Sequence, residues 1–128
     1  MPAPLTILVD GRNVLRSTWP NLTEEDVVAG SRAWATEHEG RPVVVFDGEA
    51  PGEVVGEREL DGCVLVGTGT GESADEWLIR AADEMRRRGE RFWLVTSDRA
   101  LRAAAGGAER VIGGGRFARE LQRRTRGV

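Results

Sequence analysis

The chain has 128 residues, of which 40% are hydrophobic and 30% are charged, and its formal net charge is −3. This length and composition predict a single globular domain, residues 1–128, with enough apolar residues to bury a core. No segment approaches the roughly 18 apolar residues that cross a membrane, and the start Met1-Pro-Ala-Pro4 lacks the basic residues of a signal peptide. We therefore expect a soluble, cytoplasmic protein with no membrane partner.

The chain lacks the side chains that several classes of enzyme require. All 18 basic residues are Arg, which excludes a P-loop nucleotide site and a Schiff-base enzyme, since both need a Lys. The only cysteine, Cys63, begins an apolar run and is expected to be a small core residue. The only histidine, His38, stands between two Glu and is expected to be solvated, which leaves almost no basis for catalysis by His or for a His-rich zinc site.

The first half of the chain alternates between apolar runs and a helical pattern. Residues 5–9 form an apolar run that predicts a buried strand. The segment Thr23-Glu-Glu-Asp26 has the spacing of a capping box and predicts a helix that runs to Gly40. A second strand is expected at residues 42–46. Residues 48–62 are rich in Gly and Glu, so we expect either an exposed, flap-like loop or a short edge strand there.

The second half continues this alternation. Ser73 and Glu76 have the spacing of another capping box, and Gly89 ends the helix that they begin. Around it we expect, in chain order, a strand at residues 63–66, a strand at 92–95, a short helix at 99–105, a strand at 110–112 and a C-terminal helix. Strands that alternate with helices predict a three-layer α/β/α sandwich with a mostly parallel sheet of about five strands.

Acidic residues stand where several of these strands end. Asp10, Asp47 and Asp98 follow the first, second and fourth strands, while Glu72 and Asp75 flank the start of the helix after the third. Parallel strands place their carboxyl ends at one edge of the sheet, where open α/β sheets bind ligands. Carboxylates gathered there repel one another unless protons or a cation offset the charge, and Mg²⁺ prefers oxygen ligands. The pattern therefore predicts a divalent-metal site.

Each acid also has a simpler interpretation. A single Asp after a strand is commonly a turn residue or a helix N-cap. Asp75, in the first turn of its helix, would also stabilise that helix through its dipole. The recurrence of Asp at three strand ends favours the metal site.

The basic residues gather near the C-terminus. From Arg99 onward there are eight Arg and two Glu, a charge of +6, so the preceding residues carry −9. Arg can neutralise backbone phosphates while carboxylates hold a cation, which is the arrangement that a phosphodiester-cleaving protein needs. The alternative is a solvated helix, since Phe117 and Leu121 lie four apart and would face the core while the Arg side chains face water.

Five segments resemble, in the right order, motifs of the NYN domain, a PIN-like ribonuclease fold, and in particular its YacP-like bacterial branch. They are Asp10-Gly-Arg-Asn13-Val, Val45-Phe-Asp47, Glu72-Ser-Ala-Asp75, Val95-Thr-Ser-Asp98-Arg and Phe117-Ala-Arg-Glu-Leu121. The resemblance implies a metal-dependent endoribonuclease with a five-stranded parallel sheet. It further implies that Asp10, Asp75 and Asp98 bind Mg²⁺ or Mn²⁺, that Asp47 and Glu72 are supporting catalytic acids, and that Asn13 orients substrate or a metal-bound water.

The expected reaction is metal-assisted hydrolysis of an RNA phosphodiester bond. Arg12 replaces a residue that is often aromatic in this branch and would add a phosphate contact, and Arg99 and Arg116 are expected to bind substrate. Thr96 and Ser97 are further candidates to donate hydrogen bonds to a phosphate, although capping of the following helix is the favoured role for Ser97. The loop after Asp47 and the C-terminus are short for the branch, which weakens any expectation of ribosome docking.

Other functions remain in competition. The same fold could serve as a catalytically inactive module that binds RNA or a regulatory partner. A dinucleotide site at residues 67–71 is disfavoured, because the spacing there is Gly-x-Gly-x-Gly rather than Gly-x-Gly-x-x-Gly. A phosphoacceptor receiver domain is disfavoured as well, because it would need a Lys and the chain has none. The expected partner is single-stranded RNA, free or in a ribonucleoprotein, and a homodimer stays open because dimers are the commonest oligomers.

The four Trp residues divide into two groups. Trp34, Trp77 and Trp93 fall at periodic apolar positions and are expected in the core. Trp19 lies in a polar segment near the predicted sheet edge, where it either lines the RNA groove or packs back on the helix that follows.

Overall fold

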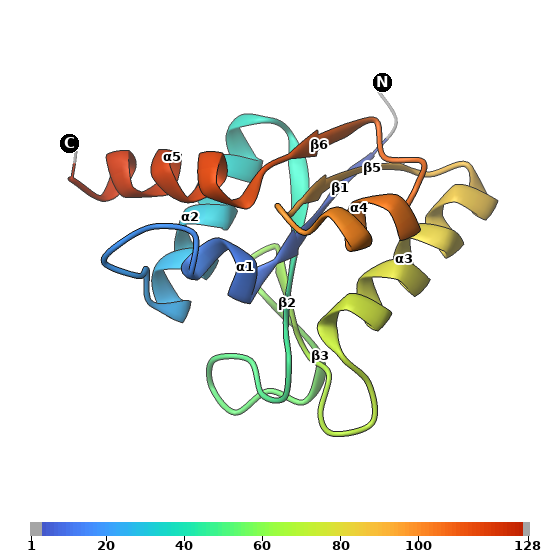
Figure 1. Ribbon diagram of the computed structural model, residues 1–128, viewed down its shortest axis with the longest axis horizontal. Coiled ribbons are helices and arrows are strands. Elements are labelled where there is room, and N and C mark those ends of the chain that lie inside the picture. The colour runs from blue at the N-terminus through green and yellow to red at the C-terminus, as the bar shows by residue number, and fades with distance from the viewer. Residues whose placement is uncertain (1–3, 127–128) are drawn as a thin grey trace.

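The computed structural model describes residues 4–126 and shows a sheet of six strands flanked by helices (Figure 1). The elements are, in chain order, β1 (Leu5–Asp10), α1 (Gly11–Leu15), α2 (Glu24–Glu37), β2 (Gly40–Phe46), β3 (Gly56–Leu60), β4 (Cys63–Gly67), α3 (Ala74–Arg88), β5 (Arg91–Val95), α4 (Arg99–Ala104), β6 (Arg110–Ile112) and α5 (Gly114–Arg126). The strands lie in the order β3-β4-β2-β1-β5-β6.

All neighbouring strands pair in parallel except β3, which runs antiparallel to β4 at one edge. The mostly parallel sheet expected from the sequence is therefore confirmed, and residues 48–62 supply an edge strand. The β3–β4 hairpin closes through Asp61-Gly62, both of which have positive φ angles (51° and 81°). Asp-Gly is a preferred pair for a two-residue turn of this kind, so this dipeptide was the local signal for the extra strand.

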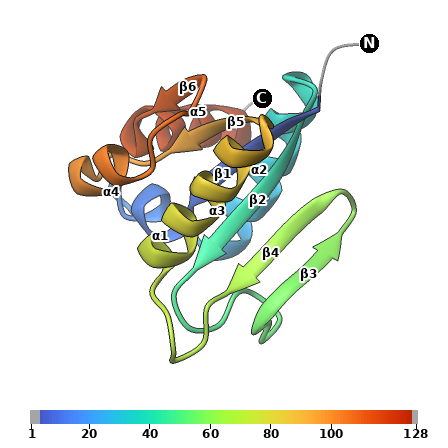
Figure 2. The same ribbon diagram turned by 90° about the vertical axis from the view of Figure 1, so that its right-hand side faces the viewer.

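Helices cover both faces of the sheet (Figure 2), and a hydrophobic core lies on each face. On one face α1, α2 and α5 cover strand residues such as Val9 and Phe46. On the other face α3 and α4 cover Leu8 and Leu94. Consecutive strand residues alternate between the two cores, which is why the apolar runs in the sequence are continuous. The predicted three-layer α/β/α sandwich is confirmed.

The helix starts follow the local signals in the sequence. Thr23 and Ser73 are the N-caps of α2 and α3, and both capping boxes are complete. Gly89 ends α3 with a φ of 68°. The helix that begins after Thr23 was expected to run to Gly40. This end was wrong, because α2 stops at Glu37 and β2 begins at Gly40. Helix α1 was not expected.

Burial confirms most of the predicted core. Cys63 is fully buried and Trp34 is 2% exposed, while Trp77 and Trp93 are partly buried against the two cores. The expectation of a solvated His38 was wrong: its ring stacks on Trp34 with a centroid distance of 3.8 Å, and its Nδ1 lies 2.8 Å from the Trp34 carbonyl oxygen. Within residues 4–126, no helix combines the length and the apolar character needed to cross a bilayer.

Candidate active site

The acids meet at the carboxyl edge of the sheet, beside its central strand. Asp10 is the last residue of β1, Asp47 directly follows β2, and Asp98 is the N-cap of α4 after β5. β1 lies between β2 and β5, and the chain builds the sheet outward from β1 first to one side and then to the other. The strand order thus reverses next to β1, which is the position where open α/β sheets form their binding crevice.

Asp10 is held in place by Thr96. Asp10 is only 7% exposed, and its Oδ2 accepts a hydrogen bond of 3.0 Å from the Thr96 hydroxyl. The same hydroxyl accepts a bond of 3.1 Å from the backbone N–H of Asp98. Thr96 is fully buried, so the expectation that it contacts a phosphate was wrong. It instead couples the positions of two of the acids.

The acids also interact through their charges. Burial raises the pKa of Asp10 to about 6, with further contributions from the negative charges of Asp75 and Asp47, although the Thr96 hydrogen bond acts in the opposite direction. Burial also raises the pKa of Asp75, and the negative charges of Asp98 and Asp47 raise it further. Asp10 and Asp75 therefore each experience repulsion from neighbouring carboxylates, which a bound cation would relieve.

Asp98 has the N-cap role that the simpler interpretation gave it, and Asp47 bonds the start of a helix whose N-cap is Ser73. Oδ1 of Asp47 accepts from the backbone N–H of Ala74, at the start of α3, at 2.8 Å. Oδ1 of Asp98 accepts from the N–H of Leu101 at 2.9 Å. Each bond uses one carboxylate oxygen, and an ionised carboxylate has a second oxygen with lone pairs to offer. Capping and cation binding are therefore compatible.

The donor set suits Mg²⁺ or Mn²⁺ in its chemistry, since every candidate ligand is a carboxylate oxygen. As the side chains stand, no group of three or more His, Cys, Asp and Glu in the described part of the chain is close enough together to hold a metal ion. The ligand set Asp10, Asp75 and Asp98 therefore stays a prediction.

Glu72 is engaged in an ion pair with Arg80 of α3. Its two carboxylate oxygens accept hydrogen bonds from Arg80 Nη2 and Nε at 2.7 and 3.2 Å. The geometry is the bidentate pairing that Arg and a carboxylate favour. Its expected role as a supporting acid stays a prediction, and the pair gives it a structural role on the flank of α3.

Asn13 joins three segments at the site. Its Oδ1 accepts from the Ser97 N–H at 2.9 Å, and the Gly115 N–H donates to Ser97 Oγ at 3.4 Å. A β-carbon at Gly114 would lie 2.0 Å from Asn13 Oδ1, so the close approach of α5 to α1 requires glycine there. Asp98, and not Ser97, is the N-cap of α4, so the favoured role of Ser97 was wrong. Contacts of Asn13 and Ser97 with substrate stay predictions.

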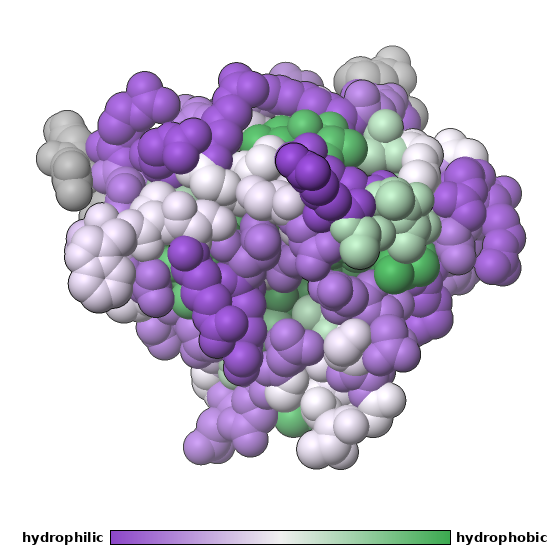
Figure 3. Space-filling model, viewed as in Figure 1, coloured by the Kyte–Doolittle hydropathy of each residue, from purple (hydrophilic) through white to green (hydrophobic). Residues whose placement is uncertain are grey.

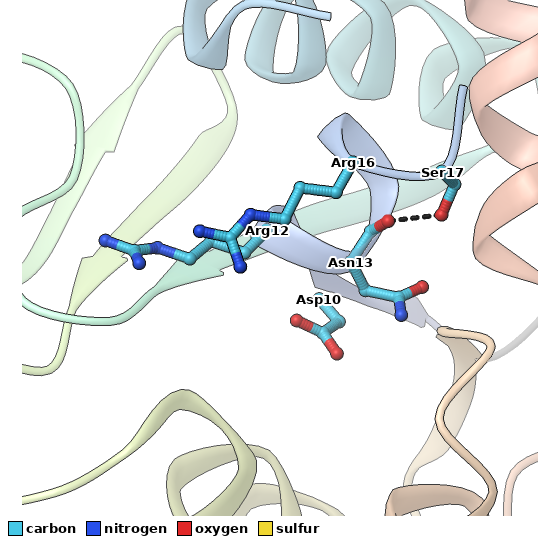
Figure 4. Close-up of a pocket in the computed structure, with 5 residues that line it drawn as sticks. All are labelled: Asp10, Arg12, Asn13, Arg16 and Ser17. Carbon is cyan, nitrogen blue, oxygen red and sulfur yellow. Dashed lines mark hydrogen bonds between the residues drawn. The ribbon is translucent and has the colours of Figure 1, made fainter. Parts of the chain in front are cut away.

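A pocket of about 270 Å³ opens beside Asp10. Its lining comes from the end of β1, from α1 and from the residues just after α1: Asp10, Arg12, Asn13, Arg16 and Ser17 (Figure 4). Figure 3 shows that hydrophilic residues surround a hollow near the centre of the face that carries α1, α3 and α4.

Arg12 was expected near the substrate and lies in this pocket, whereas Arg16 and Ser17 were missed. They were missed because the pocket depends on α1, whose residues carry no clear helical signal. Arg99 and Arg116 are exposed on α4 and α5, and their contact with substrate stays a prediction.

Two crystal structures of Rae1 (YacP) from Bacillus subtilis share the fold of this chain. A mutant form superposes with a TM-score of 0.69 and 22% sequence identity over 91% of this chain and 74% of that chain. The second structure gives a TM-score of 0.64 and 22% identity over 95% of this chain and 74% of that one. No curated protein matches the chain. The family model of the YacP-like NYN domain matches residues 7–128, and the chain therefore belongs to this family of PIN-like nucleases, a membership that suggests activity on RNA.

Proposed function

We propose that the chain is a metal-dependent endoribonuclease that hydrolyses phosphodiester bonds in single-stranded RNA. The observation that carries the proposal is the buried Asp10, whose pKa is raised by burial and by the charges of Asp75 and Asp47, at the point of the sheet where the strand order reverses. Strongly perturbed acids in a crevice are typical of functional sites. Membership of the YacP-like NYN family points to RNA as the substrate.

Asp10, Asp75 and Asp98 would hold the cation, Mg²⁺ or Mn²⁺, with Asp47 beside them. When bound, such a cation lowers the pKa of a water ligand and offsets the charge that develops on the phosphoryl oxygens. Thr96 supports this by donating to Asp10 Oδ2, which favours the ionised form of that carboxyl group.

Residues around the acids would orient the substrate. The guanidinium groups of Arg12 and Arg16 lie at the pocket beside Asp10 and offer donors to phosphate oxygens. Asn13 fixes the position of α1 relative to the segment that leads to Asp98, because its amide oxygen accepts from the Ser97 N–H. A fixed spacing between substrate contacts and acids is what positions a bond for attack.

Cleavage of a mixed-sequence single-stranded RNA tests the proposal, with Mn²⁺, Mg²⁺ or EDTA present and with the variants Asp10→Asn and Asp98→Asn. Asn caps a helix about as well as Asp and can still accept from Thr96, so both variants should fold. Asp61→Asn is the matched control, because its side chain is 85% exposed in the β3–β4 turn.

We expect products that require metal, that persist in Asp61→Asn, and that disappear in Asp10→Asn and Asp98→Asn. If the wild-type protein binds metal and RNA but produces no cleavage, the nuclease proposal is wrong and the fold serves as a binding module.

A further inference from the structure

We propose that α1 and the loop after it form a subsite for one nucleotide of a single RNA strand, in which Arg12 and Arg16 bind a backbone phosphate and Trp19 stacks on the base. This subsite rests on the proposed function, since it lies beside the candidate acids. It adds a path along which the RNA strand would lead away from the acids.

The two arginines form a like-charged pair on one side of a short helix. Arg12 lies in α1, Arg16 is its C-cap residue four positions later, and both are exposed. Residues four apart are neighbours on a helix surface, where like charges destabilise the fold. Figure 4 shows their guanidinium groups extending to the same side of the pocket. An anion between or beside them would offset this repulsion.

Neither arginine forms an ion pair within the described part of the chain. By contrast, seven others there do so: Arg32, Arg41, Arg80, Arg86, Arg88, Arg91 and Arg124. Among the described residues that line their pocket, the one acid is Asp10, which is buried and bonded to Thr96. The pair is therefore available to an external anion, and a guanidinium fork fits phosphate oxygens well.

Trp19 is presented to solvent by a loop that is fixed on both sides of it. Its side chain is 90% exposed, whereas Trp34 is 2% exposed. The Gln122 side-chain amide, on α5, donates to Thr18 Oγ1 at 3.0 Å and to the Pro20 carbonyl oxygen at 3.4 Å. These contacts hold the residues before and after Trp19. The alternative that Trp19 packs back on the following helix was therefore wrong.

The loop is also closed at its base. The Leu22 N–H donates to the Leu15 carbonyl oxygen at 3.1 Å, so the two ends of the segment 15–22 are joined. The closure ties Trp19 to α1 and hence to the pocket. Trp19 is three positions after Arg16, so their backbones lie at most roughly 11 Å apart.

The two neighbouring arginines, Arg12 and Arg16, decide which kind of partner fits this aromatic side chain. An exposed Trp alone would suit a protein or a nucleic acid. Next to two arginines without ion pairs it matches the usual combination in single-strand binding, in which cations follow the phosphates and aromatic rings stack on bases. The base must be unpaired to reach the ring, because bases within a duplex are already stacked.

RNA binding in EDTA separates this subsite from the cleavage reaction. Fluorescence anisotropy of a labelled mixed-sequence single-stranded RNA would be measured at low salt with wild type, Trp19→Ala, Trp19→Phe and the double variant Arg12→Gln/Arg16→Gln. The matched control for the double variant is Arg58→Gln/Arg87→Gln, which removes two exposed arginines from β3 and α3.

We expect Trp19→Ala to weaken binding roughly tenfold or more, as loss of one stacked base does, and Trp19→Phe to retain most of the affinity. The Arg12→Gln/Arg16→Gln variant should lower the slope of log Kd against log salt concentration by about 0.7 for each phosphate that it no longer neutralises, and more than its control does. Wild type and Trp19→Ala should bind an RNA duplex with equal affinity.

The subsite is overturned if wild type does not bind the RNA, if Trp19→Ala binds as tightly as wild type, or if the two double variants lose affinity equally. Metal-dependent cleavage together with any of these results would leave the nuclease proposal standing without the subsite. Binding that depends on Trp19, without cleavage in any metal, would keep the subsite and remove the nuclease proposal.

Discussion

Replacement of Asp10 by Asn should stabilise the metal-free protein at neutral pH, although it removes a proposed ligand. The pKa of Asp10 is about 6 in the folded protein, above its ordinary value of 3.8. The folded state therefore holds its proton more tightly than the unfolded state does. The free energy of unfolding should fall as the pH rises from about 4 to about 6, and this loss is complete at pH 7.

The size of the effect follows from the pKa difference. A rise of about 2 units corresponds to about 3 kcal/mol, at 1.36 kcal/mol per unit. Little solvent screening is expected, because Asp10 is 7% exposed. This pKa already includes the favourable Thr96 hydrogen bond to the charged carboxylate. Asn cannot ionise, so the expected gain for Asp10→Asn at pH 7 is the full difference of about 3 kcal/mol.

Urea unfolding in EDTA at pH 4 and pH 7 measures this gain. We expect the two proteins to be similar in stability at pH 4 and the variant to be more stable at pH 7. Asp61→Asn, at an exposed position, should show no such dependence on pH. Equal stability of wild type and Asp10→Asn at pH 7, or a less stable variant, would refute the reasoning that burial and neighbouring charges strain this carboxylate.

Three further substitutions test other contacts of the site. Thr96→Val should destabilise the fold by about 1 to 3 kcal/mol, because it leaves the partly buried Asp98 N–H without its acceptor. It should also raise the pKa of Asp10, which loses the hydrogen bond from Thr96, and urea unfolding across pH measures both effects. Gly114→Ala should cost about 1 to 3 kcal/mol in thermal or urea unfolding, since its β-carbon has no room, whereas Gly71→Ala, where nothing lies within 4 Å, should be nearly neutral. Glu72→Gln should lower the RNA cleavage rate by about 10- to 100-fold, as expected for a residue that supports metal ligands. A complete loss of cleavage would give Glu72 a direct role in the reaction, beyond its ion pair with Arg80.

The parts of the structure that the sequence predicted are those fixed by local signals. Thr23 and Ser73 carry complete capping boxes, and the apolar runs of β1, β2, β4 and β5 are continuous because both faces of the sheet are covered. The acids at the strand ends could be located in the same way, because a parallel sheet puts those ends on one edge.

The features that were missed depend on contacts between distant segments. Helix α1 has only five residues, and its first residue, Gly11, lies so close to Phe46 that a β-carbon would come within 2.7 Å of the ring. Its formation therefore depends on packing more than on propensity. The bond between Thr96 and Asp10 joins residues 86 positions apart, and it exists only because β5 pairs with β1.

The edge strand β3 was left open for a different reason. All of its residues, from Gly56 to Leu60, are exposed, so no apolar periodicity marks it. It is held by its pairing with β4 and by the Asp61-Gly62 turn. An edge strand that is exposed and charged in this way can be identified from its turn more readily than from its own residues.

The most direct test of the central claim compares two aspartates on the same helix. Asp75 lies in the first turn of α3 beside the other acids, and Asp83 lies two turns later, paired with Arg86. Cleavage of single-stranded RNA with Mn²⁺ under single-turnover conditions would be measured for wild type, Asp75→Asn and Asp83→Asn. The expected result is that Asp83→Asn cleaves like wild type and that Asp75→Asn does not cleave. Equal cleavage by both variants would contradict the claim that the acids at this edge of the sheet carry the reaction.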